Sequence, residues 1–130
     1  MISLVIFDCD GVLVDSEPIS VAVLRETISE AGGDIGEDDA YRLFLGRSMA
    51  SIAEMLTADF GLELTAAHLE AMRRRLFARF KAELVPIDGI GEALAALGVP
   101  FCVASSSQPD RIRLSLDLAG LRELFEPHIF

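Results

Sequence analysis

The sequence predicts an α/β fold in which a parallel sheet is interrupted, just after its first strand, by a small all-helical domain. Two short, nearly continuous apolar runs, "ISLVIF" at 2–7 and "PFCVA" at 100–104, are typical of parallel strands buried on both faces. A strand–helix–strand unit needs roughly 30 residues, yet about a hundred separate these strand ends. The surplus has helical periodicity, which assigns 16–86 to the inserted domain and leaves 1–15 and 87–130 as a partial core.

Glycines divide the inserted segment into four predicted helices. The first begins at Ser16, a residue type that caps helix N-termini, and ends before the pair Gly32 and Gly33. In the last helix, an apolar stripe lies opposite an arginine cluster, and this pattern favours a solvated face over a phosphate-binding patch. The four helices are expected at 16–31, 37–45, 48–60 and 65–85, and the arginines are Arg73, Arg74, Arg75 and Arg79.

The rest of the core is predicted to alternate helix and strand. A turn at 88–89 begins a short amphipathic helix that ends near Gly98, and the second strand follows at 100–104. The tripeptide at 108–110 then begins another helix, with a further turn or two after Gly120. The chain shows no internal repeat and no low-complexity segment.

The charge balance restricts the classes of partner. With 21 acidic and 11 basic residues, the formal net charge is −10, and its field repels nucleic acid and anionic membrane surfaces. The same field repels phosphorylated metabolites, so a phosphate site would need a local positive charge. No apolar run approaches the roughly 20 residues of a membrane span. Cys9 and Cys102 fit buried free thiols of a reducing compartment, and Met1 leads directly into a strand-like run without a secretory signal. We therefore expect a cytoplasmic protein with no nucleic-acid or membrane partner.

Polar side chains follow both predicted strands. Asp8 and Asp10 come directly after the first strand, and Ser105 follows the second. Because ligands of open α/β sheets bind beyond the carboxyl ends of the strands, we expect these residues at one site. Two carboxylates can divide phosphoryl transfer, one attacking phosphorus and the other moving the proton, and Mg²⁺ suits such an oxygen-rich site. Acids at strand ends also serve as plain turn or capping residues, so this pattern alone leaves both interpretations open.

The longer strings around these residues resemble the motifs of a known family. "FDCDGVLVDSEP" is similar to the first motif of the haloacid dehalogenase (HAD) superfamily, a hydrophobic strand followed by DxDGT or DxDGV. "FCVASSS" resembles its second motif, a hydrophobic strand that ends in Ser or Thr. The helical block resembles the C1 cap of subfamily I, and "VDSEP" is typical of the branch with β-phosphoglucomutase and phosphoglycolate phosphatase. The resemblance covers all 130 residues and implies a Rossmann-like HAD core with an inserted C1 cap.

This resemblance implies a role for each matching residue. Asp8 matches the nucleophile that becomes aspartyl-phosphate, and Asp10 matches the general acid/base, whose backbone carbonyl also binds Mg²⁺. The expected metal site therefore comprises Asp8 and Asp10. Ser105 matches the phosphate-binding hydroxyl, and Ser106 and Gly11 complete the expected phosphate-binding set. Dehalogenases and phosphonate-cleaving members lack an aspartate at the position of Asp10, so the resemblance favours phosphate esters.

The loop "FLGRSMASI" resembles the substrate-specificity loop of the family's cap. Gly46 would form its turn. Arg47 would supply the local positive charge that the net charge of −10 makes necessary, and the alternative for Arg47 is simple exposure to solvent.

The segment after Ser105 departs from the family pattern. It contains no lysine and no paired acids, whereas a complete member has a third motif with a lysine and a fourth motif with paired acids. We therefore expect that this sequence is the N-terminal portion of a longer protein, and the sequence does not indicate whether this portion is active by itself.

Three functions are compatible with the sequence. The first is a Mg²⁺-dependent phosphatase that acts on a small phosphate ester, a sugar or sugar-acid phosphate, through aspartyl-phosphate. The second is a phosphosugar mutase of the β-phosphoglucomutase kind, which would use the same two aspartates. The third is a catalytically incomplete fragment or binding module. The sequence indicates neither the particular substrate nor the oligomeric state.

Overall fold

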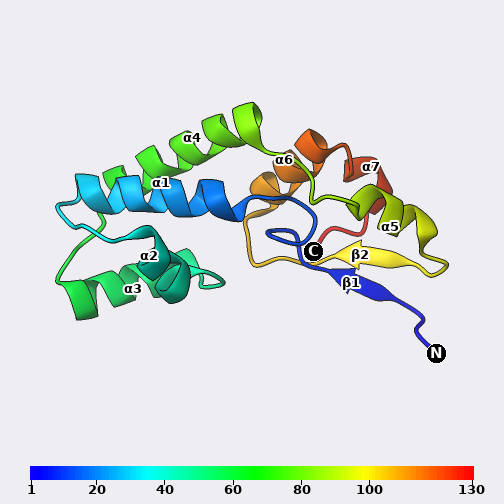
Figure 1. Cartoon of the computed structure of the whole chain (residues 1–130), viewed down its shortest axis with the longest axis horizontal. Helices are drawn as coiled ribbons and strands as arrows, with labels where there is room; N and C mark the ends of the chain where they lie inside the picture. Colours follow the sequence, from blue (N-terminus) through cyan, green and yellow to red (C-terminus); the bar gives the residue numbers. More distant parts are fainter. The chain divides into compact units, whose positions relative to one another are not determined.

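The computed structural model describes residues 1–130, which form two strands and seven helices (Figure 1). The elements are β1 (Val5–Phe7), α1 (Glu17–Glu30), α2 (Glu37–Phe44), α3 (Met49–Phe60), α4 (Ala66–Glu83), α5 (Ile90–Ala96), β2 (Phe101–Val103), α6 (Pro109–Ala119) and α7 (Arg122–Phe125). They belong to two compact units, a core unit of 1–16 and 80–130 and a helical unit of 17–79. That the helical segment 16–86 acts as an inserted cap stays a prediction. None of the helices is long and apolar enough to cross a membrane.

Strands β1 and β2 form a parallel pair in the core unit, with Val5 opposite Phe101. The pairing extends past the strands, since the backbone N–H of Ala104 donates to the carbonyl of Phe7 at 2.8 Å. The predicted α/β core with parallel strands is therefore confirmed. The carboxyl ends of both strands lie at the same edge of this small sheet, as parallel pairing requires.

The final residues of the chain pair with the free edge of β2. The N–H of Phe130 donates to the carbonyl of Val103 at 2.9 Å, and the N–H of Val103 donates to the carbonyl of His128 at 3.1 Å. Ile129 accordingly forms a parallel bridge with Val103. Because β1 pairs with the opposite edge, β2 lies between β1 and this terminal segment. Because β2 is paired on both sides, the position at which the following loop begins is fixed.

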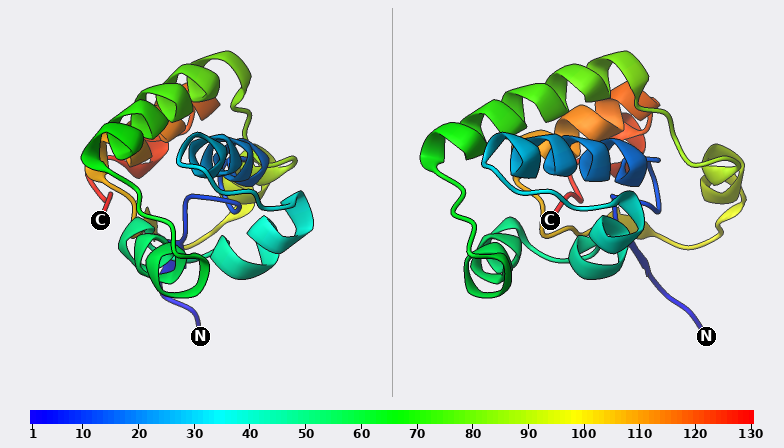
Figure 2. Two further views of the ribbon diagram at one scale, coloured as in Figure 1. Left: turned by 90° about the vertical axis from the view of Figure 1, so that its left-hand side faces the viewer. Right: turned by 60° about the vertical axis from the view of Figure 1, so that its left-hand side comes forward.

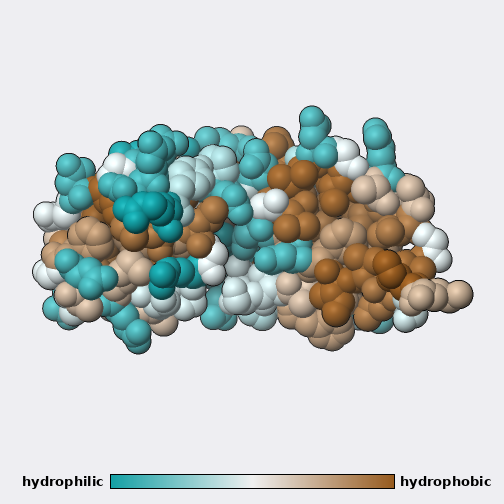
Figure 3. Space-filling model, turned by 60° about the horizontal axis from the view of Figure 1, so that its bottom comes forward, coloured by the Kyte–Doolittle hydropathy of each residue, from teal (hydrophilic) through white to brown (hydrophobic).

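Only one face of the sheet is covered. Phe7, Phe101 and Phe125 pack edge to face with ring centroids 5.1 to 6.1 Å apart, and Phe125 of α7 is completely buried. On the opposite face, Leu4 and Ile6 are 49% and 63% exposed, and Figure 3 shows an apolar surface over this part of the molecule. The prediction of strands buried on both faces is therefore wrong for β1, because the aromatic cluster covers a single face.

The helical unit has its own apolar core. Ser48 begins α3 as an N-cap whose hydroxyl accepts from the N–H of Ser51 at 3.1 Å, and the helix ends at Gly61 in the left-handed conformation with φ of 64°. This confirms the predicted third helix with its cap and its stop. The buried side chains of this core are Val21, Leu24, Ile28, Ile35, Ala40, Phe44, Ile52 and Leu56.

Two arginines of the α4 cluster bind carboxylates of α1, which runs beside α4 in both views of Figure 2. The guanidinium of Arg75 lies 2.6 Å from the carboxylate of Glu30 and 3.9 Å from that of Glu26, and Arg79 lies 3.8 Å from Glu26. These ion pairs between helices account for Arg75 and Arg79 without a phosphate ligand.

Candidate active site

A tight loop after β1 presents the two predicted carboxylates. Gly11 permits the turn because its φ of 75° lies in the left-handed region that favours glycine. Its N–H donates to the carbonyl of Val14 at 2.9 Å, and the N–H of Leu13 donates to the carbonyl of Cys9 at 2.9 Å. Leu13 and Val14 are fully buried, and Leu13 also accepts from the N–H of Ile87 at 2.9 Å. The loop is therefore anchored in the core unit, which fixes the position of its acids.

Asp10 accepts hydrogen bonds from three side chains of the core unit. Its Oδ1 accepts from the hydroxyl of Ser16 at 2.7 Å and from Nη2 of Arg111 at 3.2 Å. Its Oδ2 accepts from the hydroxyl of Ser107 at 2.9 Å. Both oxygens of this carboxylate are thus held, and charge-assisted bonds of this kind are stronger than neutral ones.

Arg111 reaches the site from the first turn of α6. Its side chain and that of Asp10 are 25% and 26% exposed, so the ion pair is largely shielded from water. The guanidinium also lies 5.3 Å from the centroid of the Phe80 ring, which is fully buried. A planar cation stacked on a fixed ring loses little freedom when it binds a carboxylate. Arg111 therefore provides a local positive charge next to the acids.

Asp8 has a different environment, although only one residue separates it from Asp10. The residue is exposed, and its Oδ1 accepts a hydrogen bond from the adjacent backbone N–H of Cys9 at 2.7 Å. The Asp8 carboxylate is therefore oriented by the backbone of its own loop, whereas the Asp10 carboxylate is also held by side chains from the segment after β2. The two acids are therefore distinguishable by structure as well as by position.

The serine loop after β2 meets the first loop through its third serine. Ser105 is held by its N–H, which donates to the carbonyl of Phe130 at 2.9 Å, and its hydroxyl accepts from the N–H of Ser107 at 3.1 Å. Ser106 is exposed in the same loop. The contact with Asp10 is made by Ser107, to which the motifs assign no role.

Three residues of the site were missed in the sequence. Ser16 was assigned only as a helix cap, Ser107 is the unselected member of the run "SSS", and Arg111 had no motif at all. The run of serines offered a signal for Ser107. Arg111 lies 101 positions from Asp10, and no local pattern could indicate that pairing.

The predicted specificity-loop residues lie in the helical unit. Gly46 has a φ of 79°, which fits the expected turn, and Arg47 is exposed while its N–H donates to the carbonyl of Phe44 at 3.1 Å. Their part in substrate binding stays a prediction.

Cys9, the residue between the two acids, is an unreactive thiol. Its side chain is 1% exposed, and burial, with the nearby charge of Asp10, raises the pKa of the thiol to about 12. The thiolate is the nucleophilic form of cysteine, so Cys9 is inert near neutral pH. It acts as a buried spacer between the acids.

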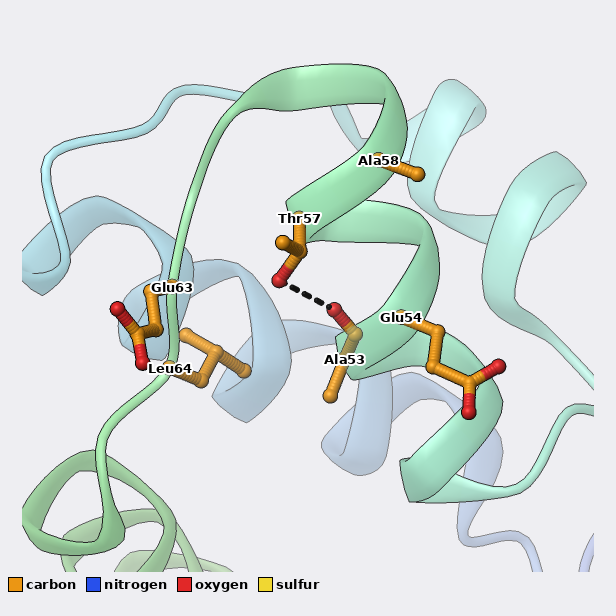
Figure 4. A pocket seen from close by; sticks show the side chains of 6 residues that line it. All are labelled: Ala53, Glu54, Thr57, Ala58, Glu63 and Leu64. Atoms are coloured by element: carbon orange, nitrogen blue, oxygen red, sulfur yellow. Dashed lines mark hydrogen bonds between the residues drawn. The ribbon is translucent and has the colours of Figure 1, made fainter.

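A shallow hollow of about 420 Å³ lies elsewhere, on the helical unit (Figure 4). It is lined on α3 by Ala53, Thr57 and neighbouring residues, and on the following segment by Glu63 and Leu64. Thr57 donates to the carbonyl of Ala53 at 3.1 Å, as the dashed line shows. None of the predicted site residues lines this hollow.

The oxygen donors of the first loop suit part of a Mg²⁺ site. Mg²⁺ in proteins is usually bound through one or two carboxylates together with substrate phosphate and water. The Asp8 carboxylate meets that minimum, and the side chain of Asp10 is already bound to protein donors. No group of three or more His, Cys, Asp or Glu side chains is arranged to hold a metal ion. These residues therefore supply only a fraction of a coordination sphere.

Comparison with family models identifies the class of this protein. Residues 5–129 match the family described as haloacid dehalogenase-like hydrolase. The chain belongs to this family, which confirms the resemblance seen in the two motifs.

Individual relatives carry more specific names. The chain is 30% identical over 130 residues to 6-phosphogluconate phosphatase of Escherichia coli (strain K12), covering 99% of this chain and 59% of that protein. It is 35% identical over 126 residues to tyrosine-protein kinase PtkA of Mycobacterium tuberculosis (strain ATCC 25618 / H37Rv), covering 95% and 42%. Among solved structures, a haloacid dehalogenase-like protein of unknown function from Agrobacterium tumefaciens superposes with a TM-score of 0.86 at 35% identity, covering 100% and 59%. The chain thus spans about half the length of the curated relatives it matches.

Proposed function

We propose that the protein that carries this chain is a Mg²⁺-dependent phosphatase of small phosphorylated metabolites, with sugar or sugar-acid phosphates as substrates. The observation that supports this most is the pair of dissimilar aspartates at the carboxyl edge of a parallel sheet. Asp8 is exposed and Asp10 is held by three donors. The similarity to a 6-phosphogluconate phosphatase agrees with this class of substrate.

The two aspartates divide the reaction in this proposal. An oxygen of Asp8 attacks phosphorus, the bond from phosphorus to the leaving oxygen breaks, and Asp10 gives that oxygen a proton. Asp10 then takes a proton from water, whose oxygen attacks the phosphorus of the aspartyl-phosphate. Inorganic phosphate leaves and the Asp8 carboxylate is restored.

The remaining predicted residues bind and orient the phosphoryl group. Ser105 and Ser106 lie in the loop after β2, where hydroxyl and backbone N–H groups can donate to phosphoryl oxygens. Gly11 allows close approach at the first loop. The Asp8 carboxylate and the backbone carbonyl of Asp10 would hold Mg²⁺, which when bound offsets the charge of phosphate and carboxylate. Gly46 and Arg47 would contact the substrate from the helical unit.

The decisive variant is Asp8→Asn in the natural protein that carries this sequence. Phosphate release from a panel of sugar and sugar-acid phosphates is measured with Mg²⁺ and with EDTA. We expect turnover only with Mg²⁺ and a loss of at least about a thousandfold in the variant, because an amide cannot form the acyl phosphate. Asp59→Asn, which makes the same charge change at an exposed site on α3, serves as the control and retains activity. Undiminished hydrolysis by Asp8→Asn would refute the assignment.

Two other activities give different products in the same assay. A mutase of the β-phosphoglucomutase kind converts one sugar phosphate isomer into another without net phosphate release. A protein kinase activity, which the name of the PtkA relative raises, moves phosphate from ATP to a tyrosine. Isomer conversion without release, or phosphotyrosine formation without ester hydrolysis, would replace the phosphatase proposal. No turnover of any kind would favour a catalytically incomplete binding module.

A further inference from the structure

Arg111 is the one cation whose guanidinium the structure places on the predicted acid/base, at 3.2 Å from Oδ1 of Asp10. We infer that Arg111, together with Ser107, is a positioning residue that orients Asp10 for proton transfer to the leaving group. This inference rests on the proposed phosphatase function. It adds two residues to which the motifs assign no role.

The geometry favours a directional role over a general electrostatic one. Arg111 binds one oxygen of Asp10 and Ser107 binds the other, at 3.2 and 2.9 Å, so the plane of the carboxylate is fixed from two sides. Both donors come from the segment after β2, whereas Asp10 comes from the loop after β1. Proton transfer depends steeply on such alignment, and general acid–base catalysis contributes typically 10²–10⁴-fold to a rate.

The guanidinium itself is held in place by packing. It lies 5.3 Å from the centroid of Phe80, a side chain with no exposed surface. The guanidinium packs against this ring while its Nη2 donates to the carboxylate, and lysine could not reproduce the stacking and the bond together. Phe80 thus supports the guanidinium on one side, while the guanidinium donates to Asp10.

The asymmetry between the two aspartates agrees with this role. Asp8, the predicted nucleophile, accepts a hydrogen bond from the N–H of Cys9, whereas Arg111 and Ser107 donate to Asp10. A residue that served mainly to bind substrate phosphate would act on all substrates alike. A residue that orients the general acid has its largest effect on the rate for substrates whose leaving group must be protonated.

The test uses the dependence on the leaving group. An alkyl phosphate leaves as a strongly basic oxygen and needs protonation, whereas p-nitrophenyl phosphate leaves as a weakly basic one and does not. kcat/KM is measured in the natural protein for p-nitrophenyl phosphate and for the alkyl phosphate that it hydrolyses best. For Arg111→Met we expect a loss of about ten- to a hundredfold on the alkyl phosphate and less than about threefold on p-nitrophenyl phosphate, within the range of general acid catalysis. Arg111→Lys should recover part of the alkyl activity.

The matched control is Arg113→Met, on the same helix. Arg113 is 42% exposed and pairs with Glu126 at 3.5 Å, so this variant makes the same charge change away from Asp10. It should leave both substrates unaffected. If Arg111→Met fails to fold, as judged by circular dichroism, Ser107→Ala replaces it and should show the same selective loss on the alkyl phosphate.

Each outcome separates the inference from the proposed function. An equal loss on both substrates, or a rise in KM alone, would overturn the positioning role and would mean that Arg111 binds the phosphate. A loss no larger than that of Arg113→Met would also overturn it. If the unchanged protein hydrolyses no ester, the proposed function fails and the catalytic role of Arg111 fails with it. If the unchanged protein is active and Arg111→Met behaves normally, only the inference fails.

Discussion

The aromatic cluster beneath the sheet should dominate the stability of the core unit. Phe125 is completely buried, with ring centroids 5.1 Å from Phe101 and 6.1 Å from Phe7. Truncating such a side chain to alanine costs about 3–5 kcal/mol. Phe125→Leu keeps most of the apolar volume but loses two edge-to-face pairs of about 0.5–1.5 kcal/mol each, so it should cost about 1–3 kcal/mol. Against a total of roughly 5–15 kcal/mol, the alanine variant removes a large share of the stability.

The assay must report on the core unit itself. The chain has no tryptophan, and its only tyrosine, Tyr41, lies in the helical unit, so intrinsic fluorescence would follow the wrong part. Native-state hydrogen exchange of peptides that contain β2 gives the free energy of opening there. The control is Leu124→Ala, the neighbouring residue on α7, which is 54% exposed and should change that free energy by less than about 0.5 kcal/mol. Equal effects of Phe125→Leu and Leu124→Ala would refute the cluster as the main support of β2.

Two further predictions concern a helix cap and a buried thiol. Ser48→Ala should lower the free energy of unfolding of the helical unit by about 1 kcal/mol in urea titrations, and Ser48→Thr, which keeps the acceptor for Ser51, should restore it. For Cys9, the pKa is raised from 9.0 to about 12, so the unfolded chain ionises first and the protein loses stability as the pH rises from 9.0 towards 12. Urea midpoints measured across this range should therefore fall less steeply in Cys9→Ala than in Cys102→Ala, and equal slopes would contradict the burial of the Cys9 thiol.

The sequence predicted the architecture where local patterns determine it. Apolar runs located both strands, and residue types such as Ser48 and Gly61 located the ends of α3. These signals are local because a cap or a left-handed turn depends on a few neighbouring residues. The extent of β-pairing is not local, and the observed strands of three residues are shorter than the apolar runs that predicted them.

The burial of β1 was predicted wrongly for a related reason. An apolar run predicts that both faces of a strand are buried. It does not indicate which element packs against each face. Phe7 packs against the rings of Phe101 and Phe125, whereas Ile6, the preceding residue, is 63% exposed on the other face. Side chains alternate along a strand, so a cluster on one side covers only every second residue.

In the candidate site, too, the local sequence predicts some features, while others depend on residues that are distant in the sequence. The motif after β1 identifies two carboxylates with one spacer and implies different roles for them, but it does not show which side chains surround each one. Their environments differ because Ser107 and Arg111, 97 and 101 positions from Asp10, donate to that carboxylate. The end of β1 places both acids at one edge of the sheet, and donors from the segment after β2 give Asp10 surroundings that differ from those of Asp8. In the proposed mechanism, the division between nucleophile and acid/base follows the donors around each carboxylate. Removal of the Arg111 contact should then slow proton transfer by Asp10 more than the attack by Asp8.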